Sequence, residues 1–389
     1  MANADLTKAK KAKNDEFYTQ WTDIEREVNA YLEYNPDVFR GKTILCPCDD
    51  PYESNFLKFF ALSFNSFGLK KLIATCYKGS PIANTQLTLF KDEPKTNKTT
   101  GVPHKIEITE VKDFNKDGAV NLLDVEWLLE NKKNTLVRLE GDGDFRSDEV
   151  KNLRDEADII ITNPPFSLFR EFLTWILEAK KQFLIIGNMN AITYKEVFPL
   201  IKENQAWLGP SISSGDRKFN VPDNFDLYAS NCGVDENGKK FIRVKGVRWF
   251  TNIDHGRRHQ PLPLMTMADN LKFSKHKEIR GKNNYDNYDN YDAIDVPYTN
   301  STPSDYDGIM GVPISFLDKY CPEQFEIVGM CENLDLYGLK TKVYTSAECQ
   351  QAYFAKFGKN GTYDLNASGV LEKNGLLEKV YQRILIKHI

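Results

Sequence analysis

The chain has 389 residues, which exceeds the roughly 100 to 200 residues of one domain and favours two domains or one domain with insertions. Its composition, with 41% hydrophobic and 12% aromatic residues, excludes the disordered, collagen-like and disulfide-scaffold classes. The 51 basic and 55 acidic residues give a net charge of -4, so a polyanionic partner needs a local basic surface. The 7 scattered cysteines and the lack of an apolar leader predict a reduced, cytoplasmic protein without membrane association.

Strands and helices alternate through the first half of the chain. The apolar spacing within 15–32 predicts a helix that follows the short segment FYT, residues 17–19. The order strand, loop, helix, strand over 41–77 is the opening of a Rossmann-like α/β sheet. A polar insertion of about 78–133 interrupts the alternation. It resumes with predicted strands at 135–140, 157–162 and 182–193 and a helix at 169–181.

The second half is richer in loops. We expect a hairpin over 239–250, a basic segment at 254–263, and an exposed loop at the low-complexity repeat NYDNYDNYD, residues 284–292. Strands are predicted at 324–330 and 380–389. We therefore place one domain at 1–265 and a smaller C-terminal domain at 266–389.

The tetrad Asn163-Pro164-Pro165-Phe166 directly follows the apolar strand DIIIT. The prolines hold an extended backbone, so the Asn163 side-chain oxygen and the Pro164 carbonyl can accept the two hydrogens of an exocyclic amine. Phe166 offers a face on which a planar base can stack. The alternative is an ordinary turn at the end of a strand.

This tetrad resembles the catalytic motif of amino-group methyltransferases that use S-adenosylmethionine. A wider set of segments is similar to the EcoRI-type family of adenine-specific DNA methyltransferases: FYTQWTDIE, CDDPYESNF, LKKLIAT, DIIITNPPFSLFREF, IIGNMNAIT and GVPISFLDKY. The resemblance implies a class I methyltransferase sheet, methyl transfer to the N6 amine of a flipped adenine in double-stranded DNA, and target recognition by the C-terminal region.

The resemblance also implies cofactor-binding residues. Phe17-Tyr18-Thr19 resembles the motif that packs against the methionine end of S-adenosylmethionine, and Asp144-Phe145 resembles the acidic-aromatic pair that binds its adenine amine. The turn after the first strand supplies Cys46 and either Asp49 or Asp50. That turn lacks the usual glycines, and the second strand lacks the usual acid for the ribose, so this contact must come from elsewhere.

A separate pattern resembles a calcium-binding loop. Oxygen-bearing side chains stand at positions 1, 3, 5, 9 and 12, with glycine at position 6, as the ion's coordination requires; the candidate ligands are Asp113, Asn115, Asp117 and Asp124. Two interpretations remain open, a structural calcium ion and a loop that folds without metal.

Basic residues after residue 210 are candidates for phosphate contacts with double-stranded DNA: Arg217, Lys218, Arg248, Arg257 and Arg258. The alternative is a solvated charged face. A DNA methyltransferase of this kind could serve restriction-modification beside a cognate restriction endonuclease, protect a phage, or act alone. Two further hypotheses are an RNA or protein methyltransferase and a DNA-binding module whose cofactor site has decayed.

Overall fold

The computed structural model describes residues 17–48, 54–76, 103–131, 136–221, 227 and 231–389. They form two compact units. The N-terminal unit is Met1–Ile201 with Gln205–Gly256, and the C-terminal unit is Lys202–Asn204 with Arg257–Ile389. The boundary between the units, at Gly256 and Arg257, lies a few residues before the expected boundary at residue 265. The role of the second unit in target recognition stays a prediction. Within the described residues, no helix is long and apolar enough to cross a membrane.

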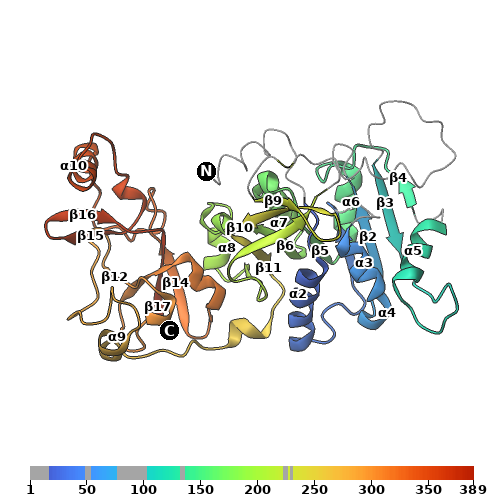
Figure 1. The fold of residues 1–389 in the computed structure, drawn as a ribbon, viewed down its shortest axis with the longest axis horizontal. Helices are drawn as coiled ribbons and strands as arrows, with labels where there is room; N and C mark the ends of the chain where they lie inside the picture. Colours follow the sequence, from blue (N-terminus) through green and yellow to red (C-terminus); the bar gives the residue numbers. More distant parts are fainter. Residues whose placement is uncertain (1–16, 49–53, 77–102, 132–135, 222–226, 228–230) are drawn as a thin grey trace. The chain divides into compact units, whose positions relative to one another are not determined.

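An eight-stranded sheet with the order β4-β3-β2-β1-β5-β6-β11-β7 forms the base of the N-terminal unit (Figure 1). β1 pairs in parallel with β2 and β5, and β5 pairs in parallel with β6. β3 and β11 run antiparallel to their neighbours. The Rossmann-like sheet expected from the sequence is confirmed. The strands are β1 (Thr43–Cys46), β2 (Lys71–Thr75), β3 (His104–Ile108), β4 (Leu136–Arg138), β5 (Ile159–Thr162), β6 (Gln182–Asn188), β7 (Trp207–Leu208) and β11 (Val247–Thr251).

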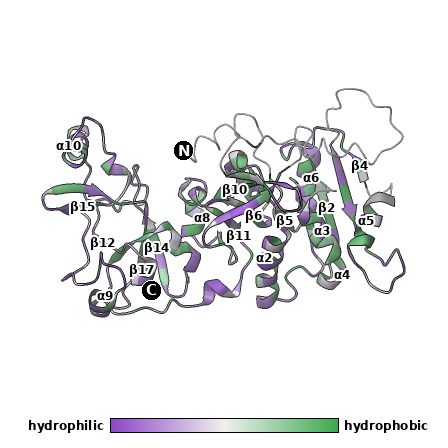
Figure 2. Cartoon of the chain, in the orientation of Figure 1, coloured by the Kyte–Doolittle hydropathy of each residue, from purple (hydrophilic) through white to green (hydrophobic). Residues whose placement is uncertain are grey.

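Helices cover both faces of this sheet, and the central strands β1 and β5 are accordingly buried at every position. On one face the main hydrophobic core joins the strands to α2 (Trp21–Tyr34) and α3 (Asn55–Leu62), and α3 is largely hydrophobic in Figure 2. On the other face Phe169 of α7 packs on Phe250 of β11, with ring centroids 5.0 Å apart. The remaining helices of this unit are α4 (Phe64–Phe67), α5 (Leu122–Asn131), α6 (Asp148–Glu156), α7 (Phe169–Glu178) and α8 (Phe198–Lys202).

A glycine sets how closely α7 approaches the sheet. A Cβ atom placed on Gly187 of β6 would lie 2.4 Å from the Phe169 ring, far inside van der Waals contact. Only glycine at this position lets the first turn of α7 lie directly on β6. The helix that follows Asn163-Pro164-Pro165-Phe166 is therefore fixed against the sheet.

The predicted hairpin over 239–250 is wrong. β10 (Lys240–Lys245) belongs to a separate sheet with the order β8-β10-β9, whereas β11 pairs with β6 and β7. Gly246, with φ +71°, turns the chain from one sheet into the other. β8 (Asp216–Asn220) and β9 (Cys232–Val234) complete the small sheet.

The C-terminal unit holds a four-stranded sheet, β12-β13-β17-β14, and a two-stranded sheet, β15-β16. The strands expected near the C-terminus are confirmed as β14 and β17. The elements of this unit are α9 (Met267–Phe273), β12 (Ala293–Asp295), β13 (Ile309–Pro313), β14 (Phe325–Met330), α10 (Ser346–Phe357), β15 (Val370–Lys373), β16 (Leu376–Lys379) and β17 (Arg383–His388).

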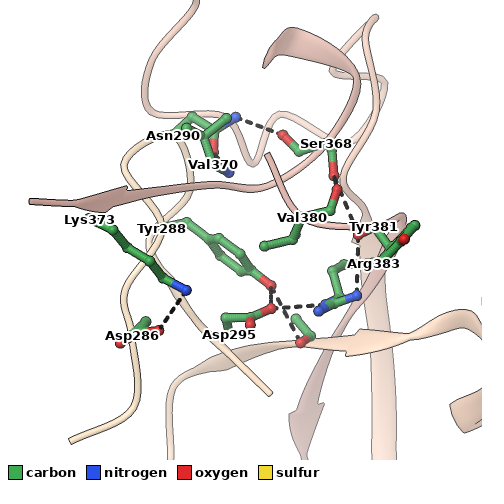
Figure 3. A network of polar contacts seen from close by, with 11 residues as sticks. Asp286, Tyr288, Asn290, Asp295, Ser368, Val370, Lys373, Val380, Tyr381 and Arg383 are labelled. Atoms are coloured by element: carbon green, nitrogen blue, oxygen red, sulfur yellow. Dashed lines mark hydrogen bonds and ion pairs between the residues drawn. The ribbon is translucent and has the colours of Figure 1, made fainter. Parts of the chain in front are cut away.

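The NYD repeat is not an exposed loop, and that prediction is wrong. Its three tyrosines are between 2% and 6% exposed, and Asn290 is fully buried. Figure 3 shows the Asn290 amide bonded to the Ser368 carbonyl (2.9 Å), and its oxygen also accepts from the Val370 backbone amide (2.9 Å). Both polar atoms of the buried Asn290 amide thus have backbone hydrogen-bond partners, which offsets the cost of burying them.

A buried ion pair lies beside the repeat. Asp295 accepts hydrogen bonds from the Arg383 Nε (2.9 Å) and from the Tyr288 hydroxyl (2.6 Å), as Figure 3 shows. Both charged side chains are less than 10% exposed. Burial beside this carboxylate raises the pKa of the Tyr288 hydroxyl, so it stays a hydrogen-bond donor. The pair ties the repeat segment to β17.

The calcium-type loop folds around its own backbone amides. The Asp113 carboxylate accepts from the amides of Asp117 (3.1 Å) and Gly118 (2.8 Å). Asp124 is buried in the first turn of α5 and accepts from the amides of Phe114 (2.7 Å) and Asn121 (2.9 Å). No group of three His, Cys, Asp or Glu side chains among the described residues could hold a metal. The calcium interpretation is therefore unsupported.

We expect Arg383→Met to destabilise the C-terminal unit by about 3–5 kcal/mol, because it leaves the Asp295 carboxylate buried without its cation. Urea unfolding followed by circular dichroism and by tyrosine absorbance measures the change, because residues 257–389 contain tyrosines but no tryptophan. The matched control Arg280→Met replaces an exposed arginine of the same unit and should cost less than about 0.5 kcal/mol. Equal effects of the two substitutions would contradict the assigned role of the buried pair.

We expect Asp124→Asn to lower the melting temperature at pH 7 by several degrees, because an amide cannot accept all of these backbone hydrogen bonds. The backbone amides lower the pKa of Asp124, that of Asn121 most strongly. The stabilisation is thus present above the ordinary carboxyl pKa and is lost as pH falls through the lowered value. In thermal melts, the melting temperatures of the wild type and Asp124→Asn should differ at pH 7 and converge in acid. The control Asp148→Asn, at an exposed carboxylate, should change the melting temperature little.

Candidate active site

The candidate site lies at the carboxyl ends of β1 and β5. These neighbouring strands stand where the strand order reverses, and ligands of open α/β sheets bind outside that edge. β5 ends at Thr162, so Asn163 is the first residue beyond the strand. The extended Pro165 (φ -53°, ψ 126°) then leads into the 3-10 turn Phe166–Leu168. The tetrad thus lies at the ligand-binding edge.

A hydrogen bond fixes the amide of Asn163. Its Nδ2 donates to the backbone carbonyl of Phe17 at 2.8 Å, and the side chain is buried. Because the nitrogen is engaged by a carbonyl, the Oδ1 atom is the one presented as an acceptor. A fixed acceptor next to the Pro164 carbonyl suits an amine that offers two hydrogens.

The segment Phe17–Thr19 is held at three points around the tetrad. Besides the Phe17 carbonyl, Tyr18 exchanges two backbone hydrogen bonds with Asn220 of β8 (2.9 and 3.0 Å), and the Thr19 carbonyl accepts from Asn55 at the start of α3 (2.7 Å). The Thr19 hydroxyl is buried and has no hydrogen-bond partner within the described chain. A buried hydroxyl at this edge fits a polar ligand such as the methionine end of S-adenosylmethionine.

Three aromatic rings pack together beside Asn163. The centroid of Phe166 lies 6.3 Å from that of Phe17 and 6.4 Å from that of Phe219, and the Phe17 and Phe219 centroids are 6.0 Å apart. Phe166 is half-buried, whereas Phe219 of β8 is 2% exposed. No local pattern in the sequence indicates this role of Phe219, because its strand belongs to a small separate sheet far along the chain.

The loop that carries Asp144 lies beside the end of β2. Gly143 has φ +73°, and a Cβ there would lie 2.2 Å from the Cys76 carbonyl oxygen, so the loop can approach only with glycine. Phe145 packs on α7, with centroids 5.1 Å from Phe172 and 5.6 Å from Trp175. Asp144 is hydrogen-bonded to Arg146 and raises the pKa of that guanidinium. The loop is thus joined to the helix that follows the tetrad.

The turn after β1 is described only in part. The Cys46 side chain is fully buried in the main core, so only its backbone is placed for a ligand at this edge. The Pro47 carbonyl accepts from the Thr75 hydroxyl at the end of β2 (3.0 Å). Asp49 and Asp50 lie outside the described residues, and their predicted contact with the cofactor stays a prediction.

The basic candidates divide by burial. Arg248 is 4% exposed and donates to the Val247 and Ser213 carbonyls, and Arg258 is 7% exposed and bonded to Asn204. Their guanidinium groups therefore hold the fold in this conformation. Lys218 is half-buried, 3.4 Å from Asp235 and 4.4 Å from the centroid of the Phe241 ring. Arg217 and Arg257 are also half-buried.

The comparisons with known proteins agree with this arrangement. A family model described as adenine-specific methyltransferase EcoRI matches residues 5–389. The Type II methyltransferase M.EcoRI of Escherichia coli is 42% identical over 336 residues, 85% of this chain and 90% of that protein. M.MpnI of Mycoplasma pneumoniae is 36% identical over 343 residues, 87% of this chain and 90% of that protein. A Type II methyltransferase of Mycoplasma genitalium is 33% identical over 386 residues, 98% of each chain. The chain therefore belongs to the EcoRI family of adenine-specific methyltransferases.

Proposed function

We propose that the protein transfers a methyl group from S-adenosylmethionine to the N6 amine of an adenine in double-stranded DNA, at one short sequence. The observation that carries the proposal is the Asn163 amide, which the Phe17 carbonyl holds with Oδ1 as its acceptor at the edge of β5. The family membership and the relatives named Type II methyltransferases support a role in restriction-modification, with a cognate restriction endonuclease as partner.

Asn163 and Pro164 orient the target amine. The Asn163 Oδ1 and the Pro164 carbonyl accept one hydrogen each, which pulls the nitrogen toward tetrahedral geometry and localises its lone pair. Neither group takes the proton that the nitrogen loses, since both stay neutral acceptors; after methyl transfer that proton passes to solvent water. When bound, S-adenosylmethionine supplies a methyl group on a sulfonium, whose S–C bond breaks as the new N–C bond forms. The protein contributes positioning and exclusion of water.

The cofactor would be held by residues around the same edge. Tyr18 and Thr19 would contact its methionine end, the turn from Cys46 to Asp50 its amino group, and Asp144 its adenine amine. The buried Thr19 hydroxyl is the contact that the geometry supports best, because it has no hydrogen-bond partner within the described chain. The packing of Phe145 on α7 keeps the loop that carries Asp144 near the tetrad.

The adenine must leave the base stack to reach Asn163, since its N6 amine is paired inside the duplex. Phe166 receives the base, and Phe17 and Phe219 support its ring from the edge. Arg217, Lys218 and Arg257 are the proposed phosphate contacts, because they keep partial exposure. The buried guanidinium groups are bonded inside their own units instead, Arg248 to the Ser213 carbonyl and Arg258 to the Asn204 side chain.

We expect Asn163→Ala to abolish DNA methylation while S-adenosylhomocysteine still binds with near wild-type affinity, because only the amine loses its acceptor. Modification-sensitive long-read sequencing of DNA from a methylation-free host measures the first effect, and calorimetry measures the second. N6-methyladenine at one short sequence in the wild type alone would support the proposal. An unmodified genome with folded protein would favour an RNA or protein substrate, or a binding module with a decayed cofactor site.

We expect Phe219→Leu to lower kcat/KM for DNA about tenfold, because Phe166 loses an aromatic neighbour and base stacking is worth about 1–3 kcal/mol. Affinity for S-adenosylhomocysteine should change less than about twofold. The matched control is Phe39→Leu, which removes a fully buried ring of the same unit that packs on Phe60 and Phe67. If both substitutions reduce turnover equally, Phe219 acts only through stability.

A further inference from the structure

Arg146 makes a two-pronged contact with the carboxylate of Asp144. Its Nε donates to Oδ1 at 2.7 Å, its Nη2 donates to Oδ2 at 2.5 Å, and its backbone amide donates to Oδ1 at 2.9 Å. A planar guanidinium bonded to both oxygens prevents rotation of the carboxylate about its own axis. Lysine, a single point of charge, could not do this.

The same guanidinium reaches the helix behind the catalytic tetrad. Its Nη1 lies 3.3 Å and 3.5 Å from the two carboxylate oxygens of Glu171 on α7. Its Cζ atom lies 5.2 Å from the centroid of the Phe145 ring, which packs on the same helix. Arg146 therefore connects the Asp144 loop to the helix that begins three residues after Phe166.

The exposures indicate where this contact acts. The Asp144 side chain is 15% exposed, whereas the side chains of Arg146 and Glu171 are 49% and 50% exposed. Ion pairs with half-exposed members add little to folding stability. The orientation of a sheltered carboxylate, in contrast, decides how well it accepts a hydrogen bond from a ligand.

We propose that Arg146 is a positioning residue for the cofactor: it holds the Asp144 carboxylate in the orientation that accepts the exocyclic amine of the adenine in S-adenosylmethionine. This inference rests on the proposed cofactor role of Asp144. Arg146 acts through Asp144, and its second contact with Glu171 sets the loop relative to the helix behind Asn163.

The test compares two ligands that differ only in the amine. Calorimetry measures the affinity of the full-length protein for S-adenosylhomocysteine and for its analogue with unsubstituted purine in place of adenine, in which a hydrogen replaces the amine at C6. We expect the wild type to prefer the amine by about tenfold or more, since hydrogen bonds to charged groups contribute about 1.5–3 kcal/mol. Arg146→Met should reduce this preference to about threefold or less, and Arg146→Lys should fall between the two.

The matched control is Arg170→Met. It removes an exposed arginine of α7, whose guanidinium lies over the Tyr194 ring. Its preference should equal that of the wild type. A purely structural role of Arg146 would weaken both ligands equally and leave the ratio unchanged, which would overturn the inference while the role of Asp144 stands. A wild type without preference would overturn the role of Asp144 and the inference together, and failure of both ligands to bind would refute the proposed cofactor. Arg146→Lys keeps the test decisive if Arg146→Met does not fold.

Discussion

The hydrogen bond from the Asn163 amide to the Phe17 carbonyl joins the residue after β5 to the segment that precedes α2. One partner follows the central strand β5, and the other precedes the first helix by only a few residues. The two residues are 146 positions apart in the sequence, and only the fold brings them together. Because the two residues are brought together by long-range contacts alone, the orientation of the Asn163 amide depends on the folded N-terminal unit.

Local patterns predict the central sheet well, because β1, β5 and β6 each contain at least three consecutive apolar residues. The boundary between β10 and β11 was missed, although the sequence carries a signal for it. Lys240–Lys245 alternates between exposed and buried residues, which is typical of a surface strand, whereas Val247–Thr251 is buried throughout, as a strand covered on both faces must be. The connection between the two strands is also too short for a hairpin, because it consists of Gly246 alone and the shortest common hairpin loop has two residues.

The burial of the NYD repeat and the contact of Phe219 with Phe166 lack a local sequence signal. Polar, repetitive composition indicates exposure only when no distant partner satisfies the polar groups. Asn290 meets Ser368 and Val370, about 80 positions further along the chain, and this pairing has no local signature. Phe219 likewise reaches Phe166 from a separate small sheet. The tetrad itself was recognisable because its chemistry resides in consecutive residues.

The helix α7 unites the two halves of the proposed reaction. Its first turn is fixed on β6 by Gly187, immediately after the residues that orient the amine. It contacts the Asp144 loop through the buried Phe172 and the exposed Glu171. Both residues lie in the same first turn as Phe169, so a shift of this turn moves the Asp144 loop and the tetrad together. Direct displacement requires that coupling, since the amine and the methyl carbon must meet in line within about 3–3.5 Å.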